Sequence, residues 1–77
     1  MSRLYFHCSN DRDTWVDATG TELRNLAEAC RHATHLMRTL IAEPTLEDWR
    51  AWTLHVSDDD GEHVLSLPFA SALGKPH

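Results

Sequence analysis

The chain has 77 residues, the size of one small domain, and its 7 Lys and Arg against 12 Asp and Glu give a formal charge of −5 at pH 7. Hydrophobic residues make up 42% of the chain, as is typical of a folded globular protein. These values argue against a multi-domain enzyme, a membrane-spanning protein and a strongly basic nucleic-acid binder. We therefore expect a single domain over residues 1–77.

The N-terminal segment predicts a β-hairpin. Residues 3–9 alternate between apolar and polar side chains, which is the pattern of a half-buried strand. A polar turn follows at residues 10–13, and residues 14–18 form a second short run with strand character. The expected hairpin spans residues 3–18.

The two faces of this hairpin differ in character. If Phe6 stands opposite Val16, the apolar face turns toward the core and the other face carries Tyr5, His7 and Trp15. Aromatic side chains on a solvent-facing sheet are typical of interfaces, so these three residues are the candidate interface. The alternative is that Trp15 folds over an edge of the core, or that the pairing differs.

An amphipathic helix is predicted over residues 25–43. Asn25 is a good N-cap, Glu28 stands where it can complete a capping box, and Pro44 cannot continue the helix. Spacings of three and four define its apolar stripe, which comprises Leu26, Ala29, Cys30, Ala33, Leu36, Met37, Leu40 and Ile41.

A second β-hairpin is predicted over residues 50–69, around a turn at Asp60-Gly61. A two-residue turn there places three apolar pairs on one face, namely Val56 with Leu65, Leu54 with Leu67, and Trp52 with Phe69. The same register sets His63 opposite Asp58. Residues 74–77 are expected to fray.

The order β-β-α-β-β predicts a two-layer α+β fold, in which one amphipathic helix packs on one face of an antiparallel sheet. A chain of this size buries a small core, and oligomerisation is a common remedy. We therefore expect a homo-oligomer, with a different protein as a possible partner.

The N-terminus has no signal-peptide pattern, and no stretch is apolar enough to cross a bilayer, so we expect a cytoplasmic protein without a membrane partner. Cys8 and Cys30 would stay reduced there. Both lie on predicted apolar faces, which indicates buried thiols that act as small hydrophobic side chains.

The histidines and arginines of the helix suggest two further kinds of site. His32 and His35 stand three residues apart and could share a face, but a metal site needs three or four converging ligands. Arg31, His35 and Arg38 form a local basic stripe, although a nucleic-acid interface needs a larger positive field. The alternative for both sets is a solvated helix face, so nucleic acid is an unlikely partner and no cofactor is expected.

Four motifs carry a resemblance to a known family: Phe6-His7, Asp17-x-x-Gly20-x-Glu22-Leu23, Asp58-x-Asp60-Gly61 and Leu67-Pro68-Phe69-Ala70. Over residues 3–73 the chain resembles a family of short uncharacterised bacterial proteins classed as a domain of unknown function. The resemblance implies no catalytic residue and no cofactor. In topology the chain is also similar to HicB-type antitoxin domains, which implies a small protein partner.

The sequence contains no nucleophile motif and no phosphate-binding loop, so we expect a protein without enzymatic activity. The leading hypothesis is a small interaction or regulatory module that self-associates, and an antitoxin-like role is one form of it. The alternative is a sensor domain that binds a ligand or a metal through surface histidines.

Overall fold

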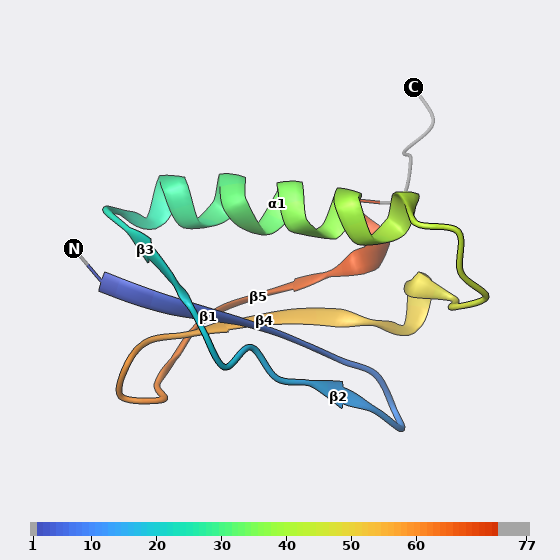
Figure 1. Cartoon of the computed structure of the whole chain (residues 1–77), viewed down its shortest axis with the longest axis horizontal. Helices are drawn as coiled ribbons and strands as arrows, with labels where there is room; N and C mark the ends of the chain where they lie inside the picture. The colour runs from blue at the N-terminus through green and yellow to red at the C-terminus, as the bar shows by residue number, and fades with distance from the viewer. Residues whose placement is uncertain (1, 73–77) are drawn as a thin grey trace.

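The predicted α+β architecture, with one helix on an antiparallel sheet, is confirmed by the computed structural model, which describes residues 2–72 (Figure 1). The predicted frayed tail lies outside these residues. The elements in chain order are β1 (Ser2–Ser9), β2 (Thr14–Trp15), β3 (Thr21–Leu23), α1 (Leu26–Ala42), the 3-10 helix η1 (Trp49–Ala51), β4 (Thr53–Ser57), β5 (His63–Pro68) and the 3-10 helix η2 (Phe69–Ser71).

The sheet has the strand order β2-β1-β4-β5. The strand β3 also pairs with β1, at residues 2–4, whereas β2 pairs with residues 8 and 9 of β1. All pairings are antiparallel. The helix α1 runs along one side of the strands (Figure 1) and packs on one face of the sheet. We call the opposite face, from which α1 is absent, the open face.

The predicted register of the first hairpin is wrong by one residue. Cys8 pairs with Trp15, and Ser9 pairs with Thr14. The physical reason is the tight turn between the strands, in which the Asn10 backbone N–H donates to the Asp13 carbonyl at 3.0 Å. Residues that stand directly opposite each other share a face, so Trp15 lies with Cys8 on the side of α1 and not on the open face.

A further strand, β3, was missed by the sequence analysis. Three residues pair with β1, and the register places Leu4 opposite Thr21. Such a short strand has no detectable alternation of its own, because its position is set by the partner strand. The chain therefore leaves the β1 edge after Trp15, passes through residues 16–20, and returns as β3.

The helix α1 begins and ends close to the predicted positions. The Asn25 Oδ1 accepts the Glu28 N–H at 2.9 Å, as expected of an N-cap. The Glu28 carboxylate accepts the Arg24 N–H at 2.9 Å, so the reciprocal bond of the capping box forms one residue earlier than predicted. Glu43 ends the helix in an extended conformation, which suits a residue before proline.

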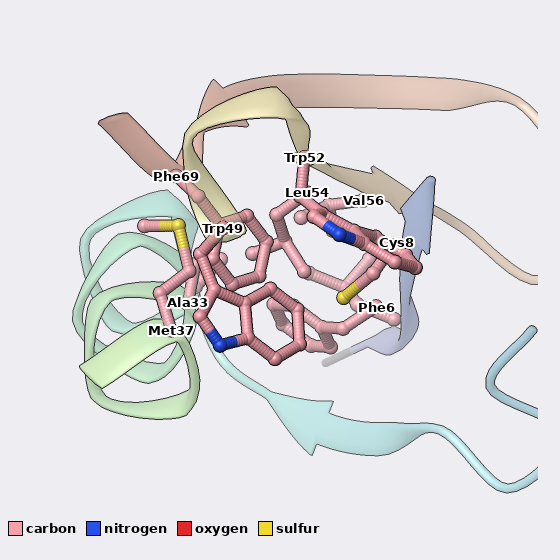
Figure 2. Packing of buried hydrophobic residues seen from close by; sticks show 11 residues of the cluster. Phe6, Cys8, Ala33, Met37, Trp49, Trp52, Leu54, Val56 and Phe69 are labelled. Carbon is pink, nitrogen blue, oxygen red and sulfur yellow. The ribbon is translucent and has the colours of Figure 1, made fainter. Parts of the chain in front are cut away.

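The core consists of eleven buried hydrophobic residues, which are Leu4, Phe6, Cys8, Ala29, Ala33, Met37, Trp49, Trp52, Leu54, Val56 and Phe69. Figure 2 shows the Trp49 and Phe69 rings beside Ala33 and Met37 of α1, with Phe6 and Cys8 on the side of the cluster away from the helix. The two buried alanines let the helix approach the sheet closely. Two expected members of the helix stripe, Leu26 and Cys30, are exposed.

The segment before β4 does not form the predicted strand from residue 50. Instead η1 begins at Trp49, and the Asp48 carboxylate caps it by accepting the Arg50 N–H at 3.1 Å. This turn brings Trp49 into the core. A local cap that satisfies a backbone donor favoured the 3-10 turn over continued strand pairing.

The C-terminal hairpin pairs Leu54 with Leu67 and Val56 with Leu65, as predicted. A β-bulge then shifts the register, so His63 pairs with Ser57 rather than with Asp58. The turn is longer than two residues because the Asp58 carboxylate accepts the N–H groups of Asp60 and Glu62, each at 2.9 Å. Within residues 2–72 no helix is both long and apolar enough to cross a membrane.

Candidate functional site

The open face carries a hydrogen-bonded group centred on His7. The Asp17 backbone N–H donates to the His7 Nδ1 at 3.0 Å, and the His7 Nε2 lies 3.1 Å from the Ser57 Oγ. A backbone N–H can only donate, so Nδ1 has no proton in the neutral ring and the proton lies on Nε2. The His7 Nε2–H therefore donates to Ser57.

Ser57, His7 and Asp17 have the composition of a catalytic triad but the opposite polarity. In a triad the histidine Nδ1–H donates to a carboxylate, and Nε2 accepts the serine proton. Here Nδ1 accepts from a backbone amide and Nε2 already carries the proton. His7 in this state cannot act as a base for Ser57, and the same proton on Nε2 prevents His7 from ligating a metal through that atom.

A second polar group crosses the open face from β1 to β5. The His55 Nε2 lies 2.9 Å from the Ser9 Oγ, and its Nδ1 lies 3.2 Å from the Ser66 Oγ. The Ser66 Oγ also contacts the His63 Nε2 at 2.7 Å. These bonds satisfy both nitrogens of His55 without a ligand. The open face is therefore a polar, hydrogen-bonded surface rather than an apolar one.

The predicted interface residues do not share one surface. Tyr5 and His7 lie on the open face, with nearly parallel rings whose centroids are 6.4 Å apart. Trp15 lies on the side of α1, where its ring contacts Trp52 at 4.7 Å and Trp49 at 5.5 Å between centroids. Trp15 therefore occupies the position given by the alternative prediction, in which it folds over an edge of the core.

The structure separates the two histidines proposed as metal ligands. His32 turns toward the core, and its ring meets Phe6 edge-on at 4.7 Å between centroids, whereas His35 is exposed on the outer side of α1. Across residues 2–72 no group of three or more His, Cys, Asp or Glu side chains could hold a metal ion. The donor set does not fit a metal centre in this part of the chain.

The basic stripe of α1 lies where the helix period predicts. Arg31, His35 and Arg38 line a shallow surface hollow together with Cys30 and Thr34. Glu28 pairs with Arg24 at 3.4 Å rather than with Arg31. The stripe is thus a local positive surface on an acidic protein.

A concave surface lies beside α1, where the chain crosses between β2 and β3. We call it the α1–β2 groove. It has a volume of about 420 Å³, which falls within the range of roughly 300–1,000 Å³ that is usual for ligand sites. Its lining residues are Phe6, Cys8, Trp15, Val16, Asp17, Thr19, Gly20, Thr21, His32, Leu36 and Leu40.

The groove is apolar and has an exposed rim. Phe6 and Cys8 of β1 are buried among the core residues, while Leu36 and Leu40 line the groove from the helix. On the rim, Val16 is 70% exposed and Trp15 is 44% exposed. Large apolar side chains that surround a hollow and remain open to water are typical of a surface that binds a partner.

Asp17 holds the outer wall of the groove in place. Its carboxylate accepts the Phe6 N–H at 3.1 Å, the Thr19 N–H at 3.0 Å and the Gly20 N–H at 3.1 Å. Partial burial favours a higher pKa, but the three N–H donors and the nearby His7 outweigh it and hold the pKa of Asp17 below its ordinary value. Asp17 is therefore an anion at neutral pH, and it replaces a strand partner for Phe6.

The thiol of Cys8, which lines the groove, is unreactive at neutral pH. Burial first, and then the negative charge of Asp17, raise the pKa of the Cys8 thiol to about 11. A thiol with so high a pKa is almost entirely protonated at neutral pH and is a poor nucleophile. The cysteine therefore contributes an apolar surface rather than reactivity.

Neither the groove residues on α1 nor the role of Val16 was predicted from the sequence. Leu36 and Leu40 belong to the predicted apolar stripe, and nothing in the periodicity distinguishes a core-facing leucine from one that lines a groove. Val16 was placed opposite Phe6, inside the core. The polar residues that follow it were a detectable sign that the chain leaves the strand at this point.

Comparison with known proteins identifies the family and no further relative. No curated protein and no solved structure matches the chain. The domain family DUF6894, a domain of unknown function, matches residues 3–70. This match covers the sheet, the helix and the α1–β2 groove, and it agrees with the resemblance carried by the sequence motifs. The chain belongs to the DUF6894 family.

Proposed function

We propose that this protein is a small non-enzymatic interaction module that binds a peptide segment of a partner protein in the α1–β2 groove. The observation that carries the proposal is the apolar groove with its exposed rim of Trp15 and Val16. Burial of these exposed apolar side chains by a partner is favourable, because it removes apolar surface from water. An antitoxin-like partnership is one form of this function.

The chemistry of the polar groups supports binding rather than catalysis. The His7 tautomer opposes activation of Ser57, and the raised pKa of Cys8 opposes nucleophilic attack. The hydroxyl and imidazole groups of the open face bond to one another on a polar surface.

The free edge of the sheet at β5 is less suited to binding another chain than the α1–β2 groove is. At the β5 edge a β-bulge interrupts the ladder, and the strand ends at Pro68, which has no N–H to donate. Both features oppose edge-to-edge pairing. Self-association remains the second candidate, because Val16 and Trp15 of one copy could enter the groove of another.

Peptide display tests the proposed function. Peptides selected on the wild-type protein are expected to bind with micromolar Kd, as measured by isothermal titration calorimetry. Val16→Ser removes an apolar contact from the rim, so it should weaken their binding about fivefold to tenfold.

Leu46→Ser is the matched control, because Leu46 is a fully exposed leucine outside the groove. It should change the affinity by less than about twofold, as expected of a side chain that makes no contact. Binders that are indifferent to Val16→Ser, or a selection that yields no binder, would contradict the proposed function.

A further inference from the structure

We propose that the occupant of the α1–β2 groove is a basic apolar segment of a different protein, in which a Lys or Arg stands beside leucine-like side chains. This inference rests on the proposed function and adds the chemistry of the partner. Its basis is three features of the groove that attract a cation: a carboxylate, the end of a helix and an aromatic ring.

The first source of charge is Asp17. Among the groove residues of the described chain, Asp17 carries a formal charge at neutral pH, and no Lys or Arg lines the groove. Its carboxylate accepts three backbone N–H bonds, and the residue is half-buried in the wall of the groove. Arg3 lies beside this wall, where its Nη1 donates to the Thr19 carbonyl at 2.9 Å, but Arg3 is itself paired with Glu22 at 3.8 Å. The Asp17 carboxylate can therefore still attract a cation that comes close to the apolar lining.

The second source is the helix α1, whose C-terminal half forms one wall of the groove through Leu36 and Leu40. The carbonyl groups at the end of a helix carry partial negative charge, and basic side chains usually compensate for it. The last turn of α1 has no basic residue. The partial negative charge at this end of α1 therefore has no basic side chain in the last turn to compensate for it.

The third feature is the uncharged Trp15 ring on the rim. The face of an indole ring attracts Lys and Arg side chains through the cation–π interaction. One side of Trp15 packs on Trp52 and Trp49, and the residue remains 44% exposed. The rim can therefore pack against an aliphatic chain and attract the cation at its end.

The same charges disfavour a second copy as the occupant. A copy that inserted Val16 into the groove would also bring its own Asp17, which follows Val16 in the chain. The turn before β2 would add one net negative charge, because Asp11 and Asp13 flank the single cation Arg12. Like charges brought together in an apolar interface oppose association, so a different and basic chain fits better.

The test uses two synthetic helical peptides with the same leucines at i, i+4 spacing, one carrying lysines and the other glutamates at the flanking positions. At low ionic strength, titration into the wild-type protein should give a Kd for the lysine peptide that is at least roughly fivefold lower than that for the glutamate peptide. Added salt should narrow this ratio. Amide NMR shifts at Val16 and Leu36 would locate the binding.

A charge-reversing pair of variants completes the experiment. Thr19→Lys places a cation on the wall of the groove and should reduce or invert the preference. Thr34→Lys adds the same charge on another side of α1, in the hollow of the basic stripe, and should leave the preference unchanged.

The outcomes separate this inference from the proposed function. Groove-dependent peptides from the display with no preference for basic residues, or equal binding of both synthetic peptides, would overturn the inference and leave the function standing. A concentration-dependent dimer in light scattering that Val16→Ser dissociates would identify a second copy as the occupant and also overturn it. Failure of both peptides, together with a display that yields no binder, would overturn the two proposals.

Discussion

At the scale of single residues, the motifs that carry the family resemblance serve the fold. Asp17 replaces a strand partner for Phe6, and His7 accepts the Asp17 N–H. Asp58 closes the β4–β5 turn, and Phe69 is fully buried. Each has a structural explanation that requires no substrate. The two rim residues of the α1–β2 groove, Trp15 and Val16, stand outside these motifs.

Because of the three N–H bonds to Asp17, the free energy of unfolding should decrease at acid pH. The pKa of Asp17 is lowered in the folded chain, so its contribution is fully present above the ordinary carboxyl pKa and is lost as the pH falls through the folded value. Asp17→Ala should cost about 1–3 kcal/mol at pH 7, because donors near the core lose their acceptor.

Urea unfolding of wild type and variant between pH 7 and strongly acidic pH measures this effect. The difference in unfolding free energy should shrink toward low pH. Asp59→Ala, in the exposed β4–β5 turn, is the control and should change stability little. A difference for Asp17→Ala that stays constant with pH would show that the carboxylate charge is not involved.

At the scale of elements, the helix could be predicted from the sequence, whereas the pairing of β1 with β2 could not. The boundaries of α1 follow from a local cap and a local stop, Asn25 and Pro44, which act within a few residues. The partner of β1 depends on the turn at residues 10–13, and a change of one residue in the register reverses the face of every side chain. For that reason Trp15 was assigned to the wrong face.

The two glycines with positive φ test how turns contribute to the fold. Gly20 has φ of 78°, and a Cβ there would lie 2.8 Å from the Arg3 Cγ and 2.9 Å from the Tyr5 Cε2. Gly61 has φ of 81°, and a Cβ there would meet nothing within 4 Å. The pair shares the backbone conformation and differs in the surrounding space.

Gly61→Ala should therefore cost about 1 kcal/mol, the strain of the left-handed conformation alone. Gly20→Ala should cost at least about 2 kcal/mol, because steric overlap with two side chains adds to that strain. Thermal and urea unfolding of both variants provide the comparison. Equal losses would mean that Arg3 and Tyr5 move aside without cost.

At the scale of the whole molecule, the three tryptophans join distant parts of the chain. Trp15 comes from β2, Trp49 from η1, and Trp52 from the residue before β4, and their ring centroids lie 4.7–5.5 Å apart. Trp49 also stacks on Phe69, with centroids 5.0 Å apart (Figure 2). Aromatic contacts of this kind stabilise a small core beyond the burial of area alone.

Trp15→Ala should destabilise the fold by about 1–2 kcal/mol, less than the roughly 3–5 kcal/mol expected when a fully buried tryptophan is removed. Trp15→Phe, which keeps an aromatic ring over Trp52, should recover part of the loss. Urea unfolding followed by circular dichroism tests both variants. A Trp15→Ala protein as stable as wild type would show that the rim tryptophan does not contribute to the core.

The sequence by itself determined the α+β class, the helix with its N-cap, and the pairing of Leu54 with Leu67 and of Val56 with Leu65. These features depend on local caps, turn residues and the alternation of apolar side chains, which act over short distances along the chain. The tertiary structure alone decided the register of β2, the presence of β3 and the α1–β2 groove. Each of these depends on contacts between residues far apart in the chain, whose energies no local pattern contains.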